Sequence, residues 1–193
     1  MEREVHYVNP GGVYILMRIR ELELKGVYLI EPEFISDNRG FFSRMFDKTE
    51  FEQIGLCTEF PQWSISHNNA KNTIRGMHLQ KPPYGEIKLI SCTKGSILDV
   101  LIDLRKDSDT YKKWISIELT EANKKSLYVP KGIAHGFKTL CDDTDVFYHI
   151  SEFYRADYSD GVLYKDEAFG IDWGDLNGFI ISEKDLTWQK FDN

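Results

Sequence analysis

A regular series of short segments rich in β-branched and aromatic residues is the feature that most constrains the fold. From residue 62 onward the sequence predicts eight strands, at residues 62–66, 73–79, 87–93, 96–104, 114–119, 125–129, 135–140 and 146–151. Turn-forming residues separate them, as in Asn68-Asn69, Pro82-Pro83 and Lys94-Gly95. Short strands at such spacing, without long helices between them, are typical of a sandwich or barrel rather than a parallel sheet. We therefore predict an all-β fold.

The flanking segments add little regular structure. We expect strands at residues 27–31 and 41–47, and a short helix behind the capping-box spacing of Asp47 and Glu50. In the C-terminal third the sequence predicts short strands at residues 162–164 and 170–173, then a helical turn capped by Ser182.

The chain reads as one domain with an N-terminal addition. Its 193 residues suffice for one sizeable core, and there is no internal repeat, low-complexity linker or break in composition. We expect residues 1–24 to form an N-terminal arm, since they hold a turn signal at residues 9–12 and little else. Residues 25–193 form the predicted domain.

Composition argues against several partners and locations. The net charge is −7 and no long basic run is present, which disfavours binding to nucleic acid or anionic lipid. No apolar run approaches the ~18 residues that a membrane span requires, and the run at residues 13–17 is too short for a signal peptide. The scattered cysteines Cys57, Cys92 and Cys141 suggest free thiols. We expect a cytoplasmic protein.

Two histidines are candidates for chemistry. In the strand at residues 73–79, alternation places His78 on one face and Arg75 on the other. If His78 faces a barrel interior, its pKa can be tuned for proton transfer; a core histidine bonded to a backbone carbonyl explains the residue equally well. His135 leaves a Pro-x-Gly turn, where it either serves a site or caps the turn.

Three further residues stand in apolar strands. Lys88 is either an edge residue or a cation aimed inward. An inward acid such as Asp99 needs a partner such as histidine or lysine. Tyr148 is either a proton donor or a core residue.

These residues lie within motifs that together resemble a known family. The motifs are Asp37-x-Arg39-Gly40-Phe41-Phe42, Arg75-Gly76-Met77-His78-Leu79-Gln80, Lys88-Leu89, residues 99–105, Pro130-x-Gly132-x-x-His135-Gly136-Phe137, Tyr148, Asp166-Glu167 with Ile171-x-Trp173, and Ser182-x-Lys184-Asp185. In order and approximate spacing they resemble the dTDP-4-dehydrorhamnose 3,5-epimerase family of cupins, over roughly residues 25–188.

The resemblance implies a fold, a partner and a reaction. The fold would be an antiparallel jelly-roll barrel with a few short peripheral helices, working as a homodimer on a nucleotide-diphospho-4-keto-6-deoxy sugar. His78, oriented by Asp185, would be the general base. Lys88 would stabilise the enolate, and Tyr148 would return the proton from the opposite face. No cofactor and no metal would be needed.

The resemblance also implies binding residues. His135, supported by Asp99, would bind the sugar, and Arg39 and Arg75 would bind the diphosphate. Gln62, Phe42 and Tyr154 complete the expected substrate-binding set. Joint use of Arg75 and His78 requires a bend at Gly76 or a phosphate at the barrel mouth.

Two positions depart from the family pattern. The family has a glutamate after its Gly-Phe-Phe motif and Gln-x-Asn before the catalytic strand, whereas this chain has Ser43-Arg44 and Gln62-Trp63-Ser64. Both positions lie near the nucleobase in the family, so thymine and another base remain open. The sequence also leaves open whether one carbon or two are inverted.

Two other functions compete with the epimerase reading. A metal-dependent cupin could use His78, Gln80, Glu86 and His135, because imidazole and carboxylate ligands suit Fe(II) and similar ions. Against this, glutamine is a poor ligand and Lys88 would be a competing cation. The other alternative is a non-catalytic sugar-nucleotide binding protein, which would have no need for an acid and a base on opposite faces.

Overall fold

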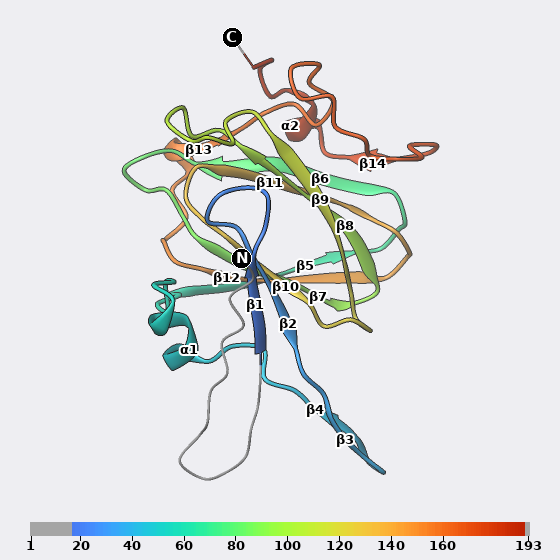
Figure 1. The fold of residues 1–193 in the computed structure, drawn as a ribbon. Helices are drawn as coiled ribbons and strands as arrows, with labels where there is room; N and C mark the ends of the chain where they lie inside the picture. The colour runs from blue at the N-terminus through green and yellow to red at the C-terminus, as the bar shows by residue number, and fades with distance from the viewer. Residues whose placement is uncertain (1–16, 192–193) are drawn as a thin grey trace.

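The computed structural model describes residues 17–191, which form two facing β-sheets (Figure 1). Sheet I has the order β1-β2-β10-β7-β12-β5, and sheet II has the order β13-β6-β11-β8-β9. Sheet I comprises Met17–Glu21 (β1), Tyr28–Pro32 (β2), Ser126–Val129 (β10), Lys88–Lys94 (β7), Thr144–Ile150 (β12) and Gln62–Asn68 (β5). Sheet II comprises Ser159–Gly161 (β13), Thr73–Gln80 (β6), Ile133–Thr139 (β11), Ser96–Asp103 (β8) and Trp114–Thr120 (β9). All of these pairings are antiparallel.

The smaller elements lie around this sandwich. Ile35–Asp37 (β3) and Gly40–Phe42 (β4) form a separate hairpin that projects from the body, and Ile180–Ile181 (β14) adds to β6 in parallel (Figure 1). The helices are Lys48–Gln53 (α1), Glu183–Leu186 (α2) and the 3-10 turn Ala156–Tyr158 (η1). Within residues 17–191 no helix has the length and apolar character needed to cross a membrane. The predicted all-β jelly roll with short peripheral helices is confirmed.

The interior is apolar on one side and polar on the other. Directly paired residues share a face of a sheet, so one inward row of sheet I runs Leu29, Leu127, Ile90, Tyr148 and Ser64. In sheet II, one inward row runs Ile115, Leu101, His135 and His78, and the next runs Ile117, Asp99, Phe137 and Arg75. The side near β2 and β9 therefore supplies the core, whereas the side near β5 and β6 gathers polar groups.

A bulge in β6 brings Arg75 and His78 onto the same face. His135 pairs with His78 and Phe137 pairs with Arg75, so two residues of β6 lie opposite Gly136 alone. A Cβ on Gly76 would lie 2.5 Å from the Cα of Gly136, and one on Gly136 would lie 2.8 Å from the carbonyl oxygen of Arg75. Both glycines are thus required by the close approach of the two strands. The prediction that Arg75 and His78 face opposite ways was wrong, because strict alternation is interrupted at Gly76.

The C-terminal segment covers the outer face of sheet II (Figure 1). Val162, Tyr164, Phe169 and Trp173 pack there against Ile74, Met77, Val100, Ile102 and Ala134. The strands predicted at 162–164 and 170–173 are absent from these described residues, because their apolar side chains pack on the sheet while β13 and β14 make the backbone pairings. The buried ammonium of Lys138 donates to the carbonyls of Trp173 and Asp175, which fastens this segment.

The predicted helical turn at the end of this segment is confirmed. The Ser182 hydroxyl accepts a hydrogen bond from the Asp185 amide at 3.1 Å, capping α2. This cap fixes the turn that carries the Asp185 carboxylate.

Helix α1 packs on the outer face of sheet I. Asp47 caps it by accepting hydrogen bonds from Thr49 and Glu50, as predicted, and Phe51 is buried against Ile19 and Tyr128. The strand predicted at 41–47 ends at Phe42. Asp47, at the end of the predicted strand, instead caps α1 and forms an ion pair with Arg44. Residues 17–24 of the expected arm are part of the sheet region, since β1 pairs with β2, and residues 1–16 lie outside the described residues.

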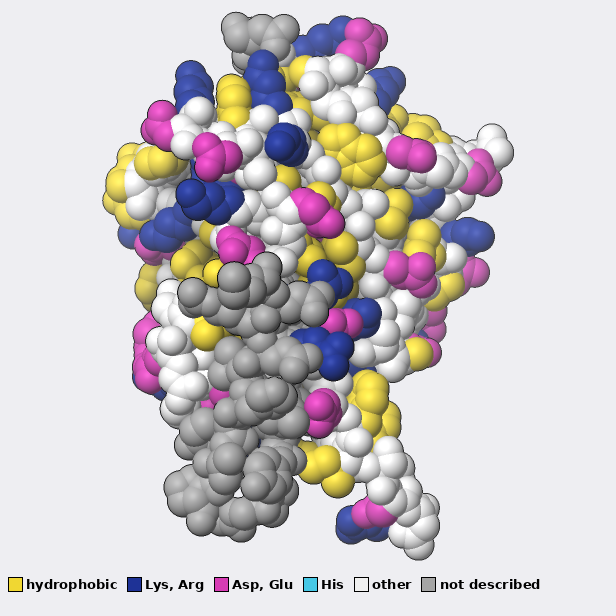
Figure 2. All heavy atoms as spheres, viewed as in Figure 1, with side chains coloured by type: hydrophobic (Ala, Val, Ile, Leu, Met, Phe, Trp, Pro, Cys, Tyr) yellow, Lys and Arg dark blue, Asp and Glu magenta, His cyan; other side chains and the backbone are white. Residues whose placement is uncertain are grey.

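Charges are mixed on the described part of the face drawn in Figure 2. Lys and Arg side chains are interspersed there with Asp and Glu, over a chain whose net charge is −7. This face therefore presents no broad surface of a single sign.

Glu50 makes stability depend on pH. Burial, reinforced by Asp47, raises the pKa of Glu50 to about 7. The contribution of Glu50 to the stability of the fold is complete below its pKa in the unfolded chain, near 4.5, and is lost as the pH rises through its folded-state pKa of about 7. We predict that Glu50→Gln has a higher melting temperature than wild type at pH 8, by about 2–4 °C for a gain of ~1 kcal/mol in the free energy of unfolding. At pH 5, where the folded protein already holds Glu50 neutral, the gain should be much smaller. An equal difference at both pH values in thermal melts would contradict this.

Candidate active site

Polar side chains from both sheets meet inside the barrel near β5 and β6. Sheet II contributes His78 and Arg75 from β6, His135 from β11 and Asp99 from β8. Sheet I contributes Tyr148 from β12 and Lys88 from β7. Lys88 is paired with Ile150, which is paired in turn with Gln62. The structure thus gathers six of the residues that the sequence analysis singled out.

His78 is joined to Asp185 across 107 residues of sequence. Its Nε2 lies 2.6 Å from Asp185 Oδ1. The other carboxylate oxygen accepts the Gly76 amide at 3.3 Å, and the Trp188 indole donates to Oδ1 at 3.3 Å. The Asp185 side chain is 6% exposed and that of His78 is 38% exposed. Burial alone would raise the pKa of Asp185, but the contacts with His78, the Gly76 amide and Trp188 together hold the pKa below its usual value. With Nε2–H donating to an ionised partner, Nδ1 of His78 is left to accept a proton.

His135 has the same arrangement deeper in the barrel. Its Nε2 lies 2.8 Å from Asp99 Oδ2, and Asp99 is fully buried with Oδ1 lacking a partner in the described residues. Burial raises the pKa of Asp99, and His135 and then Lys88 oppose that rise. Each histidine is thus bonded to a carboxylate: His78 to Asp185 rather than to a backbone carbonyl, and His135 to Asp99.

Tyr148 and Lys88 face these histidines from the other sheet. The rings of Tyr148 and His135 meet edge to face with centroids 6.0 Å apart. Burial, and then Asp99, raise the pKa of Tyr148 well above that of free tyrosine, while Arg75 acts in the opposite direction. The Lys88 ammonium lies 2.7 Å from Glu86, and both side chains are almost buried. Tyr148 is therefore a neutral phenol at physiological pH, and the Lys88 ammonium is held by Glu86.

The remaining expected binding residues fall into two places. Gln62 accepts a hydrogen bond from the Tyr154 amide at 2.8 Å, which places these two residues together at the start of β5. Arg39 and Phe42 lie on the projecting β3–β4 hairpin, where the Arg39 guanidinium grips Asp37 and its side chain is 86% exposed (Figure 1). The structure does not bring Arg39 and Phe42 to the interior cluster of their own chain.

Two neighbours of the site were missed by the sequence reasoning. The ring of Trp188 contacts that of His78, with centroids 6.0 Å apart, and its indole donates to Asp185. Its position three residues after Asp185, at a helical turn, is the sequence signal that could have identified it. Asn68 hydrogen-bonds Arg75 at 2.7 Å, and the sequence treated it only as part of a turn.

The residues proposed for a metal-dependent alternative do not converge. Gln80 donates to the carbonyls of Tyr84 and Phe153 and accepts the Arg155 amide, while Glu86 is paired with Lys88. Over residues 17–191 no group of three or more His, Cys, Asp or Glu side chains is arranged to hold a metal ion. The four side chains of that hypothesis are each committed to different partners.

Comparison with known proteins identifies the family of the chain. The family model for dTDP-4-dehydrorhamnose 3,5-epimerase matches residues 21–193. The chain belongs to this family. It is an isomerase that acts on carbohydrates, as the motif resemblance predicted.

Individual relatives span nearly the whole chain. An epimerase of this name from Shigella flexneri is 37% identical over 176 residues, covering 91% of this chain and 96% of its own. The crystal structure of the Bacillus anthracis epimerase with TDP and PPi bound is 40% identical, covers 91% and 99% of the two chains and has a TM-score of 0.87. The structure of a Legionella pneumophila dTDP-6-deoxy-D-glucose-3,5-epimerase with dTDP-4-keto-L-rhamnose is 31% identical, covers 90% and 92%, and has a TM-score of 0.85.

The buried pair of His135 and Asp99 gives a stability prediction. We expect His135→Ala to lower the free energy of unfolding by about 3–5 kcal/mol at pH 7, because it leaves a buried carboxylate without its partner. The double variant His135→Ala/Asp99→Ala removes that carboxylate and should be more stable than the single one. Urea denaturation of the three proteins measures this. A double variant less stable than His135→Ala would show that the pair does not act in this way.

Proposed function

We propose that this protein inverts C3, C5 or both in a dTDP-4-keto-6-deoxy sugar during deoxysugar biosynthesis. The observation that carries the proposal is His78 on β6, bonded to Asp185, on the sheet that faces the partly buried phenol of Tyr148 on the other sheet. A base and an acid on opposite sides of a bound sugar are what inversion of a carbon centre requires. Nucleotide sugars are made in the cytoplasm, where we propose that the enzyme works.

His78 would remove the proton. The C4 ketone acidifies the hydrogens on C3 and C5, and Nδ1 of His78 is the free nitrogen of an imidazole whose Nε2 is bonded to Asp185. Because the pKa of Asp185 is lowered, its carboxylate stays ionised and favours the imidazolium that forms. A positioned base of this kind contributes on the order of 10²–10⁴-fold to the rate.

Lys88 would stabilise the enolate oxygen. Its ammonium is held by Glu86 at 2.7 Å and is largely withdrawn from solvent. A preorganised charge aimed at a developing oxyanion is worth roughly 3–4 kcal/mol. Because Glu86 fixes the ammonium before substrate binds, no reorganisation is needed as the negative charge appears.

Tyr148 would return a proton to the other face of the enolate. Its raised pKa keeps the phenol protonated until a strongly basic carbanion is present. His135, held by Asp99, would bind the sugar beside it, and Arg75 would bind the diphosphate. The ligands named for the Bacillus anthracis and Legionella pneumophila structures, TDP and dTDP-4-keto-L-rhamnose, support thymidine as the nucleoside.

Solvent deuterium exchange tests this mechanism. We predict that the wild-type protein in D₂O incorporates deuterium at C3, C5 or both in dTDP-4-keto-6-deoxyglucose, and that His78→Ala lowers exchange by at least about 10²-fold. Tyr148→Phe should still exchange deuterium but form little inverted product, because an enolate without the phenol is reprotonated from the His78 side. Proton NMR at each carbon reads both results and shows whether one centre or two exchange.

Controls separate the alternatives. UDP- and GDP-linked 4-keto sugars, tested in parallel, report the nucleotide preference. If wild-type protein exchanges deuterium into none of these substrates, it is not an epimerase of this class. Exchange that is lost on chelation and restored by a divalent ion would instead favour the metal-dependent alternative.

We further propose that the protein acts as a homodimer in which the β3–β4 hairpin serves the partner's site. The hairpin projects from the barrel and exposes Phe34, Ile35, Phe41 and Phe42 (Figure 1). Trp63 and Ile65 on the outer face of edge strand β5 are also more than half exposed. Apolar groups so placed favour burial against another copy, which would allow Arg39 and Phe42 to reach a nucleotide.

Mixing of two inactive variants tests the shared site. Arg39→Ala and His78→Ala are each expected to have low activity, but co-expressed chains should regain up to about one quarter of wild-type activity, since half the dimers are mixed and each has one intact site. Light scattering gives the oligomeric state of every sample. A mixture no more active than its components would place Arg39 in its own subunit's site or outside any site.

A further inference from the structure

The guanidinium of Arg75 is held by two neutral oxygens at the end of β5. Its Nε donates to Asn68 Oδ1 at 2.7 Å, and one Nη donates to the carbonyl of His67 at 3.3 Å. Within residues 17–191, Arg75 takes part in no ion pair with a carboxylate within 4 Å. Of the five N–H groups of a guanidinium, these two bonds use two, and the other three remain for a ligand. The charge of Arg75 is thus fixed in place without being neutralised.

Asn68 is itself locked in one orientation. It is 2% exposed, and its amide nitrogen donates to the carbonyls of Ser66 and Thr144, both at 3.1 Å. Because both amide hydrogens are used, Oδ1 is the atom turned towards Arg75. An aspartate here would have no hydrogens for the two carbonyls and would neutralise the arginine charge. An amide side chain supplies both the two donors and a neutral acceptor for Arg75.

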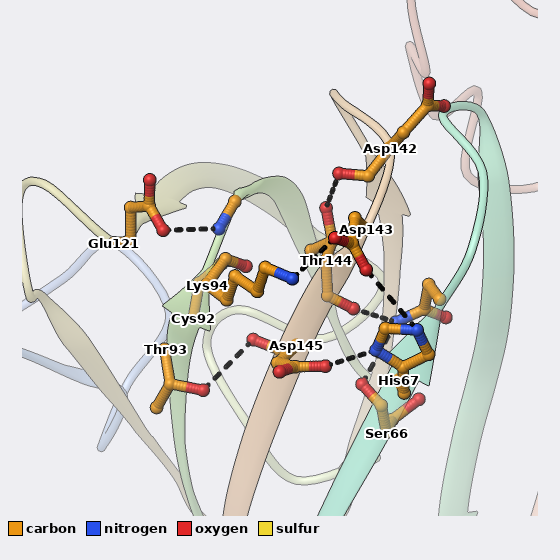
Figure 3. Close-up of polar contacts among 12 residues, drawn as sticks. Ser66, His67, Cys92, Thr93, Lys94, Glu121, Asp142, Asp143, Thr144 and Asp145 are labelled. Carbon is orange, nitrogen blue, oxygen red and sulfur yellow. Dashed lines mark hydrogen bonds and ion pairs between the residues drawn. The ribbon is translucent and has the colours of Figure 1, made fainter.

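The neighbouring residue is anchored as well. Figure 3 shows the His67 ring between two carboxylates at the start of β12. Its Nδ1 lies 2.6 Å from Asp145 and its Nε2 lies 3.6 Å from Asp143, which in turn pairs with Lys94 at 2.5 Å. These contacts tie the end of β5 to β12 and β7. The His67 carbonyl that accepts from Arg75 is therefore held in position by the contacts of its own side chain.

We propose that Asn68 is a positioning residue that presents Arg75 to the diphosphate of the nucleotide sugar. This inference rests on the proposed function and adds a specific residue to it. A guanidinium already fixed by Asn68 loses less conformational freedom when it binds an anion, and its uncompensated charge favours a doubly charged diphosphate. Asn68 touches Arg75 but takes no part in proton transfer, so its removal should weaken binding and spare chemistry.

A double-mutant cycle on Asn68 and Arg75 tests this assignment. The measurements are kcat and KM for dTDP-4-keto-6-deoxyglucose and the inhibition constant of inorganic pyrophosphate, a probe that lacks a nucleobase. Asn68→Ala should raise KM and the pyrophosphate constant by roughly tenfold, the loss of one hydrogen bond to a charged group, with kcat changed less than about twofold. In an Arg75→Ala background the same change should have no further effect. The matched control Asn69→Ala, at an exposed neighbour, should behave as wild type.

Two more variants guard against misfolding. Asn68→Ser keeps one hydrogen for a backbone carbonyl but is too short to reach Arg75, and should show the same rise in KM as Asn68→Ala. Arg75→Lys keeps Asn68 and the charge but lacks the Nε donor, and should also raise KM while sparing kcat.

Specific results would overturn the inference. Equal losses from Asn68→Ala with and without Arg75, or a fall in kcat and melting temperature without a change in the pyrophosphate constant, assign Asn68 a structural role only. If wild-type protein turns over the substrate but Arg75→Ala binds pyrophosphate normally, the inference fails while the proposed function stands. If wild-type protein neither turns over the substrate nor is inhibited by pyrophosphate, both fail.

Discussion

The backbone contact between β6 and β11 at Gly76 and Gly136 is the constraint on which the site depends. Because neither strand has a side chain at this point, β6 can accommodate one extra residue and shift its alternation. Arg75 and His78 then share the inner face with His135, and the Gly76 amide turns to Asp185. A side chain at either glycine would force the strands apart. The glycines of the Arg-Gly-x-His and His-Gly-Phe motifs are thus structural conditions for placing charged groups.

The second organising feature is a carboxylate behind each imidazole. Asp185 backs His78 and Asp99 backs His135, but the two pairs differ in their surroundings. Asp185 is bonded by an amide and an indole as well, which keeps its pKa low, whereas Asp99 is fully buried with one oxygen unpaired, which raises its pKa. The same pair of residue types therefore has a partly exposed imidazole in one place and a buried one in the other.

The C-terminal segment links packing to chemistry. Val162, Tyr164 and Trp173 cover the outer face of sheet II, and α2 follows them to the edge of β6. The bonds of Lys138 to two carbonyls hold this cover in place. Packing of apolar side chains on the outside of the sheet thereby helps to place the Asp185 carboxylate against His78.

The sequence by itself predicted most strands of the two sheets, the turns between them and both short helices, because these depend on local periodicity, capping and turn chemistry. It did not predict the short or peripheral strands β1, β3, β13 and β14. It could not decide which face Arg75 occupies, since the bulge arises from contact with Gly136, 60 residues away in sequence. The path of residues 162–173 was also beyond it, because apolar residues that pack on a sheet look locally like strands. The contacts of Asn68 with Arg75 and of Trp188 with the His78 ring are made only when the fold brings these residues together. Local interactions select the elements, whereas side-chain placement across sheets follows from long-range register and packing, which only the tertiary structure sets.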